Sequence, residues 1–374
     1  MKRSTKRVGI KLLKILCILV ASPFVYQGIN LFLPHIDAMA SRLAIISAGT
    51  VMPEGGNAVL SDKISQYQQG EENSDISTII ESPQVPQETQ TSSESQESSQ
   101  PVLAKPENAG EIYRKQYTAA ANSQHINIGN NAYIRNITNH TNQEVIDQIA
   151  NPPAFEITDT SEPQVLIMHT HTTEGYELQT ADWYDKNFNS RTTDSSLNVV
   201  RVGEEITKQL KAAGIGVIHD TTLHDYPTFP GCYDRSAVTV QNYLKQYPSI
   251  KIVLDVHRDA IEDKSGVRYA PVANINGKNA AQVMIISGCD DGTMNYPNYF
   301  LNLRFAVVLQ KQMEGDYPGL TRPVLFDYRK YNQHLTSGSL LLEMGSVANS
   351  LEEVIYSGEL VGKSLAKAIN SMKK

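Results

Sequence analysis

Short apolar runs alternate with amphipathic stretches from about residue 164 to the C-terminal end of the sequence. Runs such as 165–168, 252–254 and 340–342 are typical of buried strands, whereas apolar residues at spacings of three and four over 199–213 are typical of a helix. Strands that alternate with helices predict an α/β fold with a mostly parallel central sheet flanked by helices. Ligands of such sheets bind beyond the carboxyl ends of the strands, so the polar residues there are candidates for a site.

The N-terminal part of the chain has a different character. Residues 1–14 hold six basic and no acidic side chains, and we expect them to form a basic cytoplasmic tail. The apolar stretch 15–33 has nineteen residues, close to the ~20 that cross a bilayer as a helix. Because the basic residues precede this stretch, we expect a single-pass membrane anchor with a cytoplasmic N-terminus and an extracytoplasmic body. A cleaved signal peptide that ends at Ala38-Met39-Ala40 is the alternative.

Residues 53–108 are expected to form a disordered linker, because they are rich in Ser, Gln, Glu and Pro and poor in groups that can build a core. A single catalytic domain is expected over 126–374. The net charge is −7 and the basic excess is confined to the N-terminus, which argues against nucleic acid as a partner. Three cysteines exclude a dense disulfide framework, although one Cys232–Cys289 bridge stays open.

The polar residues at the predicted strand ends suit a hydrolytic zinc site. His169 and His171 follow the first strand, His257 follows an independent strand and Glu343 ends the late one. Such a site uses three His or Asp/Glu ligands and leaves one position open, while a separate carboxylate moves the proton. The two leading histidines are spaced by two, so we expect them on the same side of an extended strand.

Several assignments stay open at this point. Glu174 and Asp194 compete for the carboxylate ligand, and Asp194 could equally cap the following helix. Asp255 and Asp259 are candidates to orient His257 through its second ring nitrogen. Arg258 is a candidate substrate-binding residue, with a structural ion pair to Asp259 as the alternative. Three further histidines are weaker ligand candidates, namely His219, His224 and His334.

The chain resembles the stage II sporulation protein P family of endospore-forming bacteria. The resemblance covers residues 126–374 and the layout of anchor and linker. It rests on five stretches, VLIMHTHTTEGY at 165–176, NVVRVG at 198–203, LDVHRDA at 254–260, YNQH at 331–334 and LLEMG at 341–345. That family is similar in fold to zinc-dependent N-acetylmuramoyl-L-alanine amidases. The resemblance implies a Zn²⁺ enzyme that cleaves the N-acetylmuramoyl-L-alanine amide of peptidoglycan, with endopeptidase action on stem-peptide cross-links also attributed to the family.

The resemblance also implies roles for individual residues. His257 matches the later zinc histidine, and Glu343, with Asn349 six residues on, matches the catalytic glutamate. The first zinc histidine aligns with His171 or His169. The amidases' zinc glutamate precedes the first long helix, where this chain has Asp194, so the carboxylate ligand stays open.

As partners, the resemblance implies a lytic transglycosylase and a multi-span membrane protein that act with the enzyme in forespore engulfment and septal wall thinning. Two other functions remain as alternatives. One is another metal-dependent hydrolase, such as an amidohydrolase barrel, for which the ~250 residues of that fold exceed the space available. The other is a non-catalytic wall-binding scaffold.

Overall fold

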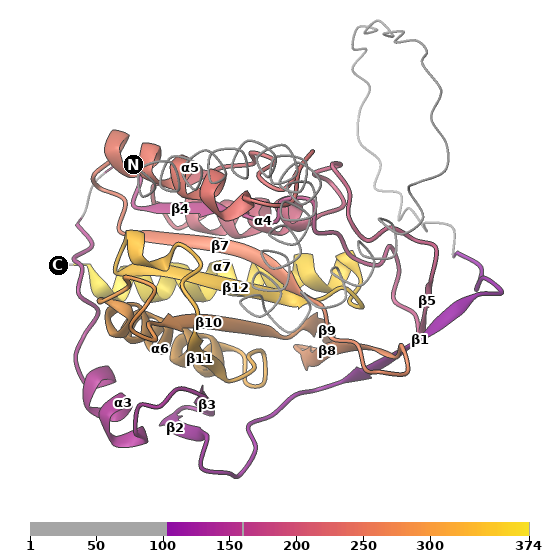
Figure 1. Cartoon of the computed structure of the whole chain (residues 1–374), viewed down its shortest axis with the longest axis horizontal. Helices are drawn as coiled ribbons and strands as arrows, with labels where there is room; N and C mark the ends of the chain where they lie inside the picture. The colour runs from indigo at the N-terminus through magenta and orange to yellow at the C-terminus, as the bar shows by residue number, and fades with distance from the viewer. Residues whose placement is uncertain (1–102, 159–160, 374) are drawn as a thin grey trace, which may run out of the picture. The chain divides into compact units, whose positions relative to one another are not determined.

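An eight-stranded sheet forms the centre of the computed structural model, which describes residues 103–158 and 161–373 (Figure 1). The strands follow the spatial order β2-β3-β11-β10-β12-β7-β4-β6. Their bounds are β2 His125–Gly129, β3 Ala132–Asn136, β4 Val165–Met168, β6 Val217–His219, β7 Ile252–Asp259, β10 Val283–Cys289, β11 Val324–Tyr328 and β12 Gly338–Ser346.

The sheet is mixed, which corrects the prediction of a mostly parallel one. Strands β12, β7, β4 and β6 run parallel to one another, and so do β10, β11 and β3, but the two groups meet antiparallel at β10 and β12. Between β7 and β10 the chain forms the β8–β9 hairpin and no helix. Because a parallel arrangement would require a crossover connection, usually a helix, β10 runs antiparallel to β7 and β12. The carboxyl end of β12 and the amino ends of β10, β11 and β3 therefore share one edge.

The hairpin belongs to a second, four-stranded sheet in the order β5-β1-β8-β9. Its strands are β1 Ala109–Lys115, β5 Trp183–Asp185, β8 Arg268–Ile275 and β9 Lys278–Ala281. Strand β1 runs parallel to β8 and antiparallel to β5. Folded structure thus begins upstream of residue 126.

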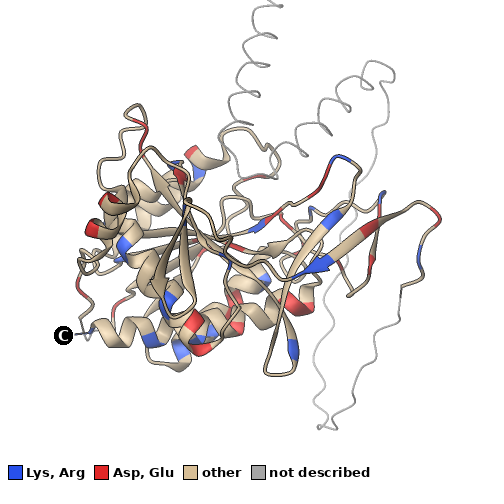
Figure 2. Cartoon of the chain, turned by 90° about the horizontal axis from the view of Figure 1, so that it is seen from below, with Lys and Arg blue, Asp and Glu red and all other residues tan. Residues whose placement is uncertain are grey.

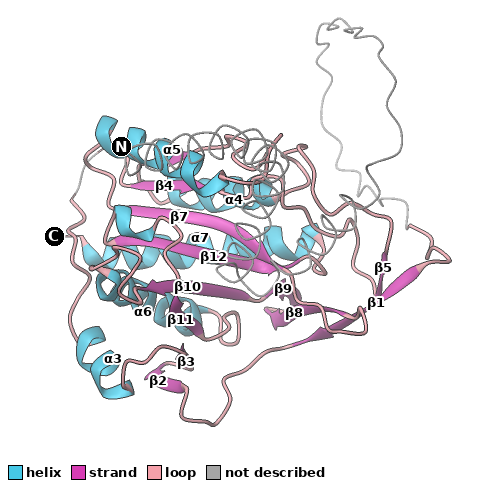
Figure 3. Cartoon of the chain, viewed as in Figure 1, coloured by secondary structure: helices cyan, strands magenta, loops and turns pink. Residues whose placement is uncertain are grey.

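Helices flank the large sheet (Figure 3). They are α3 Asn142–Ile149, α4 Val199–Ala212, α5 Cys232–Gln246, α6 Tyr299–Asp316 and α7 Leu351–Met372, with the short 3₁₀ helix η1 at Gln333–Leu335. Alternate residues of β4 point to opposite faces, as a strand requires. Val165 and Ile167 share a core with α4, α6 and α7, whereas Leu166 and Met168 pack with Val240 of α5.

Basic and acidic residues occur on helices, strands and loops alike in the described domain (Figure 2). Cys232 and Cys289 are both buried and free, so no disulfide joins them. The expected anchor at 15–33 and the linker up to residue 102 lie outside the described residues. Among the helices within 103–158 and 161–373, none has the length and apolar character needed to span a bilayer.

The described end of the expected linker contacts the folded domain. The backbone N–H of Leu103 donates to Gln179 Oε1 at 2.9 Å, and Asn108 Nδ2 donates to Asp185 Oδ1 at 3.1 Å. These bonds hold the chain beside β5 before it enters β1.

Candidate metal centre

The predicted strand ends lie next to one another. Strands β4, β7 and β12 are neighbours in the sheet, and their parallel registers place Met168 beside Asp255 and His257 beside Glu343. Parallel neighbours bring their carboxyl ends to a common edge. Residues from three distant parts of the chain therefore converge there.

Three of the candidate ligands form a compact buried cluster. His171, Glu174 and His257 each offer one ligand atom, and these atoms lie within 4.8 Å of one another. His171 Nδ1 is 3.3 Å from Glu174 Oε1, and His257 Nδ1 is 3.5 Å from Glu174 Oε2. Each of these side chains is at most 7% exposed. Of the two candidate carboxylates, Glu174 is thus the one that lies between the imidazoles.

A tight turn positions His171 and Glu174. Strand β4 ends at Met168, and the backbone N–H of Glu174 donates to His171 O at 3.1 Å. Asp255 holds the start of this turn, because it accepts bonds from the Thr170 backbone at 2.8 Å and hydroxyl at 2.7 Å. The turn therefore brings the imidazole at 171 and the carboxylate at 174 to the same side.

The loop around Glu174 is held by charge and by backbone donors. Arg258 N–H donates to Glu174 Oε2 at 3.1 Å, and Arg191 Nη2 is 3.4 Å from Glu174 Oε1. Burial by itself raises the pKa of Glu174, but hydrogen bonds and charges of His171 and His257 outweigh it, so this pKa lies well below the usual value. The carboxylate is thus kept ionised, as a metal ligand must be.

His257 lies between two carboxylates. Its Nε2 is 2.8 Å from Asp255 Oδ1, while its Nδ1 faces Glu174. Burial lowers the pKa of His257, but the charges of Asp255 and Glu174 reverse the direction and raise it well above the usual value. Asp255 therefore orients this imidazole, as expected from the sequence, whereas Asp259 does not.

His171 is packed against aromatic rings, and only its Nδ1 faces Glu174. Its ring centroid lies 4.9 Å from that of Phe229 and 5.5 Å from that of Tyr233. The other ring nitrogen, Nε2, is buried and has no hydrogen-bond partner among the described residues. Burial lowers the pKa of this imidazole, which favours the neutral form that binds metals.

The side chain of Glu343 lies beside the cluster, on the strand next to His257. Both of its carboxylate oxygens are buried and lack a partner among the described residues. Burial, together with the negative charge of Asp259, raises the pKa of Glu343 well above its usual value. Asn349 supports the following turn, since its Oδ1 accepts a bond from Ser346 N at 2.9 Å and its Nδ2 donates to Pro271 O at 3.2 Å. Burial of this carboxyl group therefore favours its protonated form.

His169 takes a supporting position instead of joining the cluster. Its Nδ1 is 2.9 Å from Val256 O and its Nε2 is 2.8 Å from His219 Nε2. Burial lowers the pKa of His169 to about 3 and that of His219 to about 4, so both rings stay neutral. The expectation that His169 and His171 share one side is wrong, because the strand ends at Met168 and the turn redirects the second ring.

The remaining candidates lie elsewhere. Asp194 is exposed and accepts bonds from Ser196, while Asn198 caps α4 by accepting from Val200 N. His224 Nδ1 is 2.8 Å from His169 O. His334 lies in η1 and is not part of the metal-type cluster.

Arg258 is buried and contacts the loop around Glu174. Its Nε donates to Gly175 O at 2.6 Å and its Nη2 to Ser190 Oγ at 3.1 Å. The alternative of an ion pair with Asp259 is wrong, because Arg322 Nη1 binds the Asp259 carboxylate at 2.7 Å and Arg258 reaches only the backbone oxygen of Asp259.

Two residues near the loop that carries Glu174 were not predicted from the sequence. Asp225 accepts bonds from the Thr173 hydroxyl at 2.6 Å and from Arg191 at 2.8 Å, which fixes the loop that carries Glu174. Tyr176 is fully buried, and its hydroxyl has no partner within the described chain. Only Tyr176 could have been found, because it lies in the same short polar stretch as His171.

The donor set fits a zinc ion. Two imidazoles and one carboxylate are a ligand combination that catalytic zinc sites use. The unpartnered Nε2 of His171 and the unpartnered oxygens of Glu343 are buried polar atoms, which proteins rarely leave without a partner. We conclude that the cluster could hold a divalent metal ion next to a protonatable carboxyl group.

Comparisons with known proteins agree with the motifs. The family model for stage II sporulation protein P matches residues 54–369. Stage II sporulation protein P from Bacillus subtilis (strain 168) is 32% identical over 201 residues, which are 51% of this chain and 47% of that protein. The match thus spans about half the length of the curated relative.

Solved structures of N-acetylmuramyl-L-alanine amidases were also found. Ami1 from Mycobacterium smegmatis has 14% identity and a TM-score of 0.32, and covers 58% of this chain and 100% of its own. The amidase from Clostridium difficile 630 has 14% identity and a TM-score of 0.33, with coverage of 57% and 97%.

Proposed function

The chain belongs to the stage II sporulation protein P family, and we propose that it is a zinc-dependent peptidoglycan hydrolase. The bond proposed for cleavage is the amide between the N-acetylmuramoyl group and L-alanine, with stem-peptide cross-links as a second target. The observation that carries this proposal is the buried cluster of His171, Glu174 and His257 beside Glu343. Burying so many ionisable groups costs free energy unless they are paired or bind a metal, and such clusters are typical of functional sites.

The ion would be held by His171, Glu174 and His257. Bound there, zinc would supply Lewis acidity toward a carbonyl oxygen and toward water. The surrounding residues prepare these ligands. Asp255 orients the His257 ring, and the N–H of Arg258 keeps the Glu174 carboxylate turned toward both imidazoles.

Glu343 moves the proton in this proposal. Its carboxylate form accepts a proton from the attacking water, and its acid form then delivers that proton to the leaving amine nitrogen. Burial and the charge of Asp259 raise the pKa of Glu343, which makes its protonated form easier to populate and so supports the step that delivers the proton. The Tyr176 ring is buried in the loop that carries Glu174, and the partly buried Tyr233 ring packs against His171.

The test is metal analysis combined with product analysis on the full-length chain. We expect about one zinc per chain, loss of hydrolysis after treatment with a chelator, and recovery on adding zinc. Digested peptidoglycan should yield new L-alanine amino termini. Hydrolysis that survives complete metal removal would contradict the zinc role. A folded, metal-free and inactive protein that still binds cell walls would favour the scaffold alternative, and cleavage of non-wall substrates alone would favour another metal hydrolase.

We also propose that the domain acts outside the cell membrane, held by the segment 15–33 with its N-terminus in the cytoplasm. Membership of the family supports a role in engulfment and septal wall thinning during endospore formation. A lytic transglycosylase and a multi-span membrane protein are the proposed partners. Cross-linking in sporulating cells, followed by identification of the captured proteins, tests this part, and capture of neither protein would contradict it.

A further inference from the structure

Strand β1 lies outside the domain expected from the sequence, yet side chains at its C-terminal end lead to the chain that follows Glu343. It occupies the residues between the expected linker and residue 126, and it pairs in parallel with β8. The segment 344–349, called the Glu343 turn below, leads from Glu343 of β12 toward α7. The proposed mechanism assigns no role to β1.

The first contact is an ion pair that reaches the Glu343 turn through two side chains. Arg114 Nη2 of β1 donates to Glu353 Oε1 of α7, and the Glu353 side chain is only 4% exposed. The other carboxylate oxygen of Glu353 accepts a bond from Asn349 Nδ2 at 3.1 Å. Asn349 Oδ1 in turn accepts a bond from Ser346 N at 2.9 Å. A continuous path of polar contacts therefore runs from β1 into the turn.

The backbone of Tyr117, two residues after β1, makes the second contact. Its N–H donates to Gln282 Oε1 at 2.6 Å, and its carbonyl oxygen accepts a bond from Gln282 Nε2 at 3.0 Å. The backbone oxygen of Gln282 accepts a bond from Gly345 N at 3.1 Å. Gly345 has a φ of 67°, a conformation that residues other than glycine rarely adopt. The turn is thus held from a second side in a specific backbone conformation.

The ring of Tyr117 makes the third contact, through an arginine. The guanidinium carbon of Arg322 lies 5.3 Å from the centroid of this ring, and Arg322 Nη1 is 2.7 Å from Asp259 Oδ2. Asp259 is the acidic residue whose charge, after burial, contributes most to the raised pKa of Glu343. The chain after β1 therefore also contacts the residue that neutralises the acidic neighbour of Glu343.

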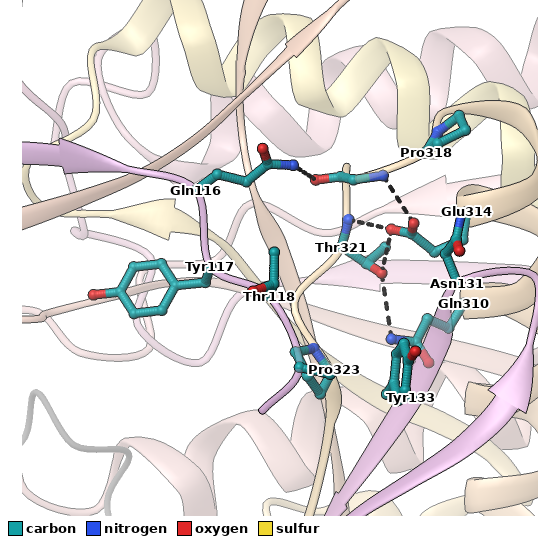
Figure 4. A pocket seen from close by; sticks show the side chains of 12 residues that line it. Gln116, Tyr117, Thr118, Asn131, Tyr133, Gln310, Glu314, Pro318, Thr321 and Pro323 are labelled. Atoms are coloured by element: carbon teal, nitrogen blue, oxygen red, sulfur yellow. Dashed lines mark hydrogen bonds between the residues drawn. The ribbon is translucent and has the colours of Figure 1, made fainter. Parts of the chain in front are cut away.

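Residues 116–118 and residues of the loop 318–323, which carries Arg322, line the same cavity (Figure 4). Gln116 Nε2 donates to Gly319 O at 3.4 Å, and the same oxygen accepts a bond from Gln282 Nε2 at 2.9 Å. The segment after β1, the loop and Gln282 are thus joined to one another by hydrogen bonds.

We propose that the segment 114–117 positions the Glu343 turn, with Arg114 as a positioning residue that acts through Glu353 and Asn349. This inference rests on the proposed function, because it assigns the turn a part in placing Glu343 for proton transfer. Loss of Arg114 would leave the buried Glu353 carboxylate without its cation and would weaken its hold on Asn349. Small displacements of a reacting group lower the rate steeply, so hydrolysis would fall.

Zinc binding should not change with Arg114. None of the contacts described above involves His171, Glu174 or His257, the three residues of the metal-type cluster. A variant at 114 should therefore keep its metal and its affinity for substrate while the chemical step slows. A purely structural role for β1 would instead lower the stability of the folded chain and leave the turnover of the folded molecules unchanged.

Arg114→Met in the full-length chain tests the coupling with two independent readouts. The substitution keeps an aliphatic stem and removes the charge. Hydrogen exchange of the amides at 344–349, measured by mass spectrometry, reports on the turn without any hydrolysis, and we expect it to rise about fivefold or more. The appearance of new L-alanine amino termini gives kcat, which should fall about 10–100-fold. KM and zinc content should stay equal to those of the parent chain.

Three further variants make the result specific. Arg114→Lys keeps a cation for Glu353 and should restore kcat to within about threefold of the parent value. Lys278→Ala is the matched control, because Lys278 Nζ is 3.2 Å from Glu352 in the same first turn of α7 and should leave both readouts unchanged. Should Arg114→Met not fold, Arg114→Gln, which retains a polar end, takes its place with the same expected direction.

A double-mutant cycle tests the path itself. Asn349→Ala is measured alone and together with Arg114→Met. If Arg114 acts through Asn349, the second change should lower kcat by less than about twofold beyond the first. Fully independent effects of the two substitutions would overturn the proposed path.

The outcomes also separate this inference from the proposed function. If Arg114→Met raises exchange at the turn as expected while the parent chain hydrolyses no wall substrate, the coupling stands and the enzyme function fails. If the parent chain hydrolyses peptidoglycan and Arg114→Met leaves kcat unchanged, the positioning role is wrong, whatever happens to stability. Loss of zinc from Arg114→Met, or failure of Arg114→Lys to restore kcat, would overturn it as well.

Discussion

Glu343 of β12 lies opposite His257 of β7, and neither carboxylate oxygen of Glu343 has a hydrogen-bond partner in the described part of the chain. A carboxyl group buried in this way favours its protonated form, because burial penalises the charge. The pairing brings a buried carboxyl group next to a metal-type ligand. The division of labour between the two residues can be tested by changing each in turn.

Glu343→Gln should separate proton transfer from metal binding. The amide keeps the size of the side chain but cannot exchange a proton, so we expect hydrolysis to fall by about 10²–10⁴-fold. Zinc content, measured by atomic absorption, should stay equal to that of the parent chain. Activity above one tenth of the parent value would assign the proton transfer to another group.

His171→Ala and His169→Ala should differ in metal content, although both remove an imidazole from the same short stretch. His171 lies in the ligand cluster, so its loss should abolish stoichiometric zinc binding. His169 bonds to Val256 O and His219, so its loss should lower the free energy of unfolding by about 1–3 kcal/mol and leave the zinc bound. Denaturant titration and metal analysis of both variants distinguish the roles. Zinc loss confined to His169→Ala would exchange the two assignments.

Glu177→Gln should change how stability depends on pH. Burial raises the pKa of Glu177 from 4.5 to about 7. Because the folded-state pKa lies above the unfolded one, this residue's contribution to stability is fully present below pH 4.5 and is lost as pH rises through about 7. The free energy of unfolding of the variant, relative to that of the parent chain, should therefore rise between these pH values, by at most about 3.4 kcal/mol. Unfolding curves at pH 4.5 and 8 provide the measurement, and a pH-independent difference would refute the assignment.

Arg322→Gln should be strongly destabilising, whereas Arg322→Lys should be milder. The Arg322–Asp259 pair is 2.7 Å long and its side chains are 11% and 3% exposed. Removing one partner leaves a buried carboxylate unpaired, which costs about 3–5 kcal/mol. Lysine retains the positive charge and should recover part of this loss. Equal unfolding free energies for the two variants would show that charge pairing is unimportant here.

The sequence predicted most of the residues at the sheet edge that carries the metal-type cluster, because it marks where strands end. The run at 165–168 coincides with β4, and His257 and Glu343 fall in the adjacent strands β7 and β12. A fully buried strand is a continuous apolar run, so the polar residues at its end stand out. The position of His257 and Glu343 on one edge then follows from parallel pairing.

Other features depend on contacts that no local pattern encodes. The choice between His169 and His171 depends on a turn that begins one residue after β4, and the position of Glu174 depends on bonds to Arg258 and Arg191. The antiparallel direction of β10 depends on the β8–β9 hairpin of the small sheet, and the strands of this hairpin contain no clear apolar run. Asp259 pairs with an arginine 63 residues away rather than with its neighbour.

Gly203 of α4 lies against the imidazoles of His169 and His219. A methyl group at this position would lie 2.6 Å from His219 Nε2 and 2.8 Å from His169 Nε2, closer than such atoms can approach. The displaced ring would pull on the carbonyl of Val256, whose peptide leads directly into His257. A single added carbon on α4 would thus misalign a prospective zinc ligand without touching it.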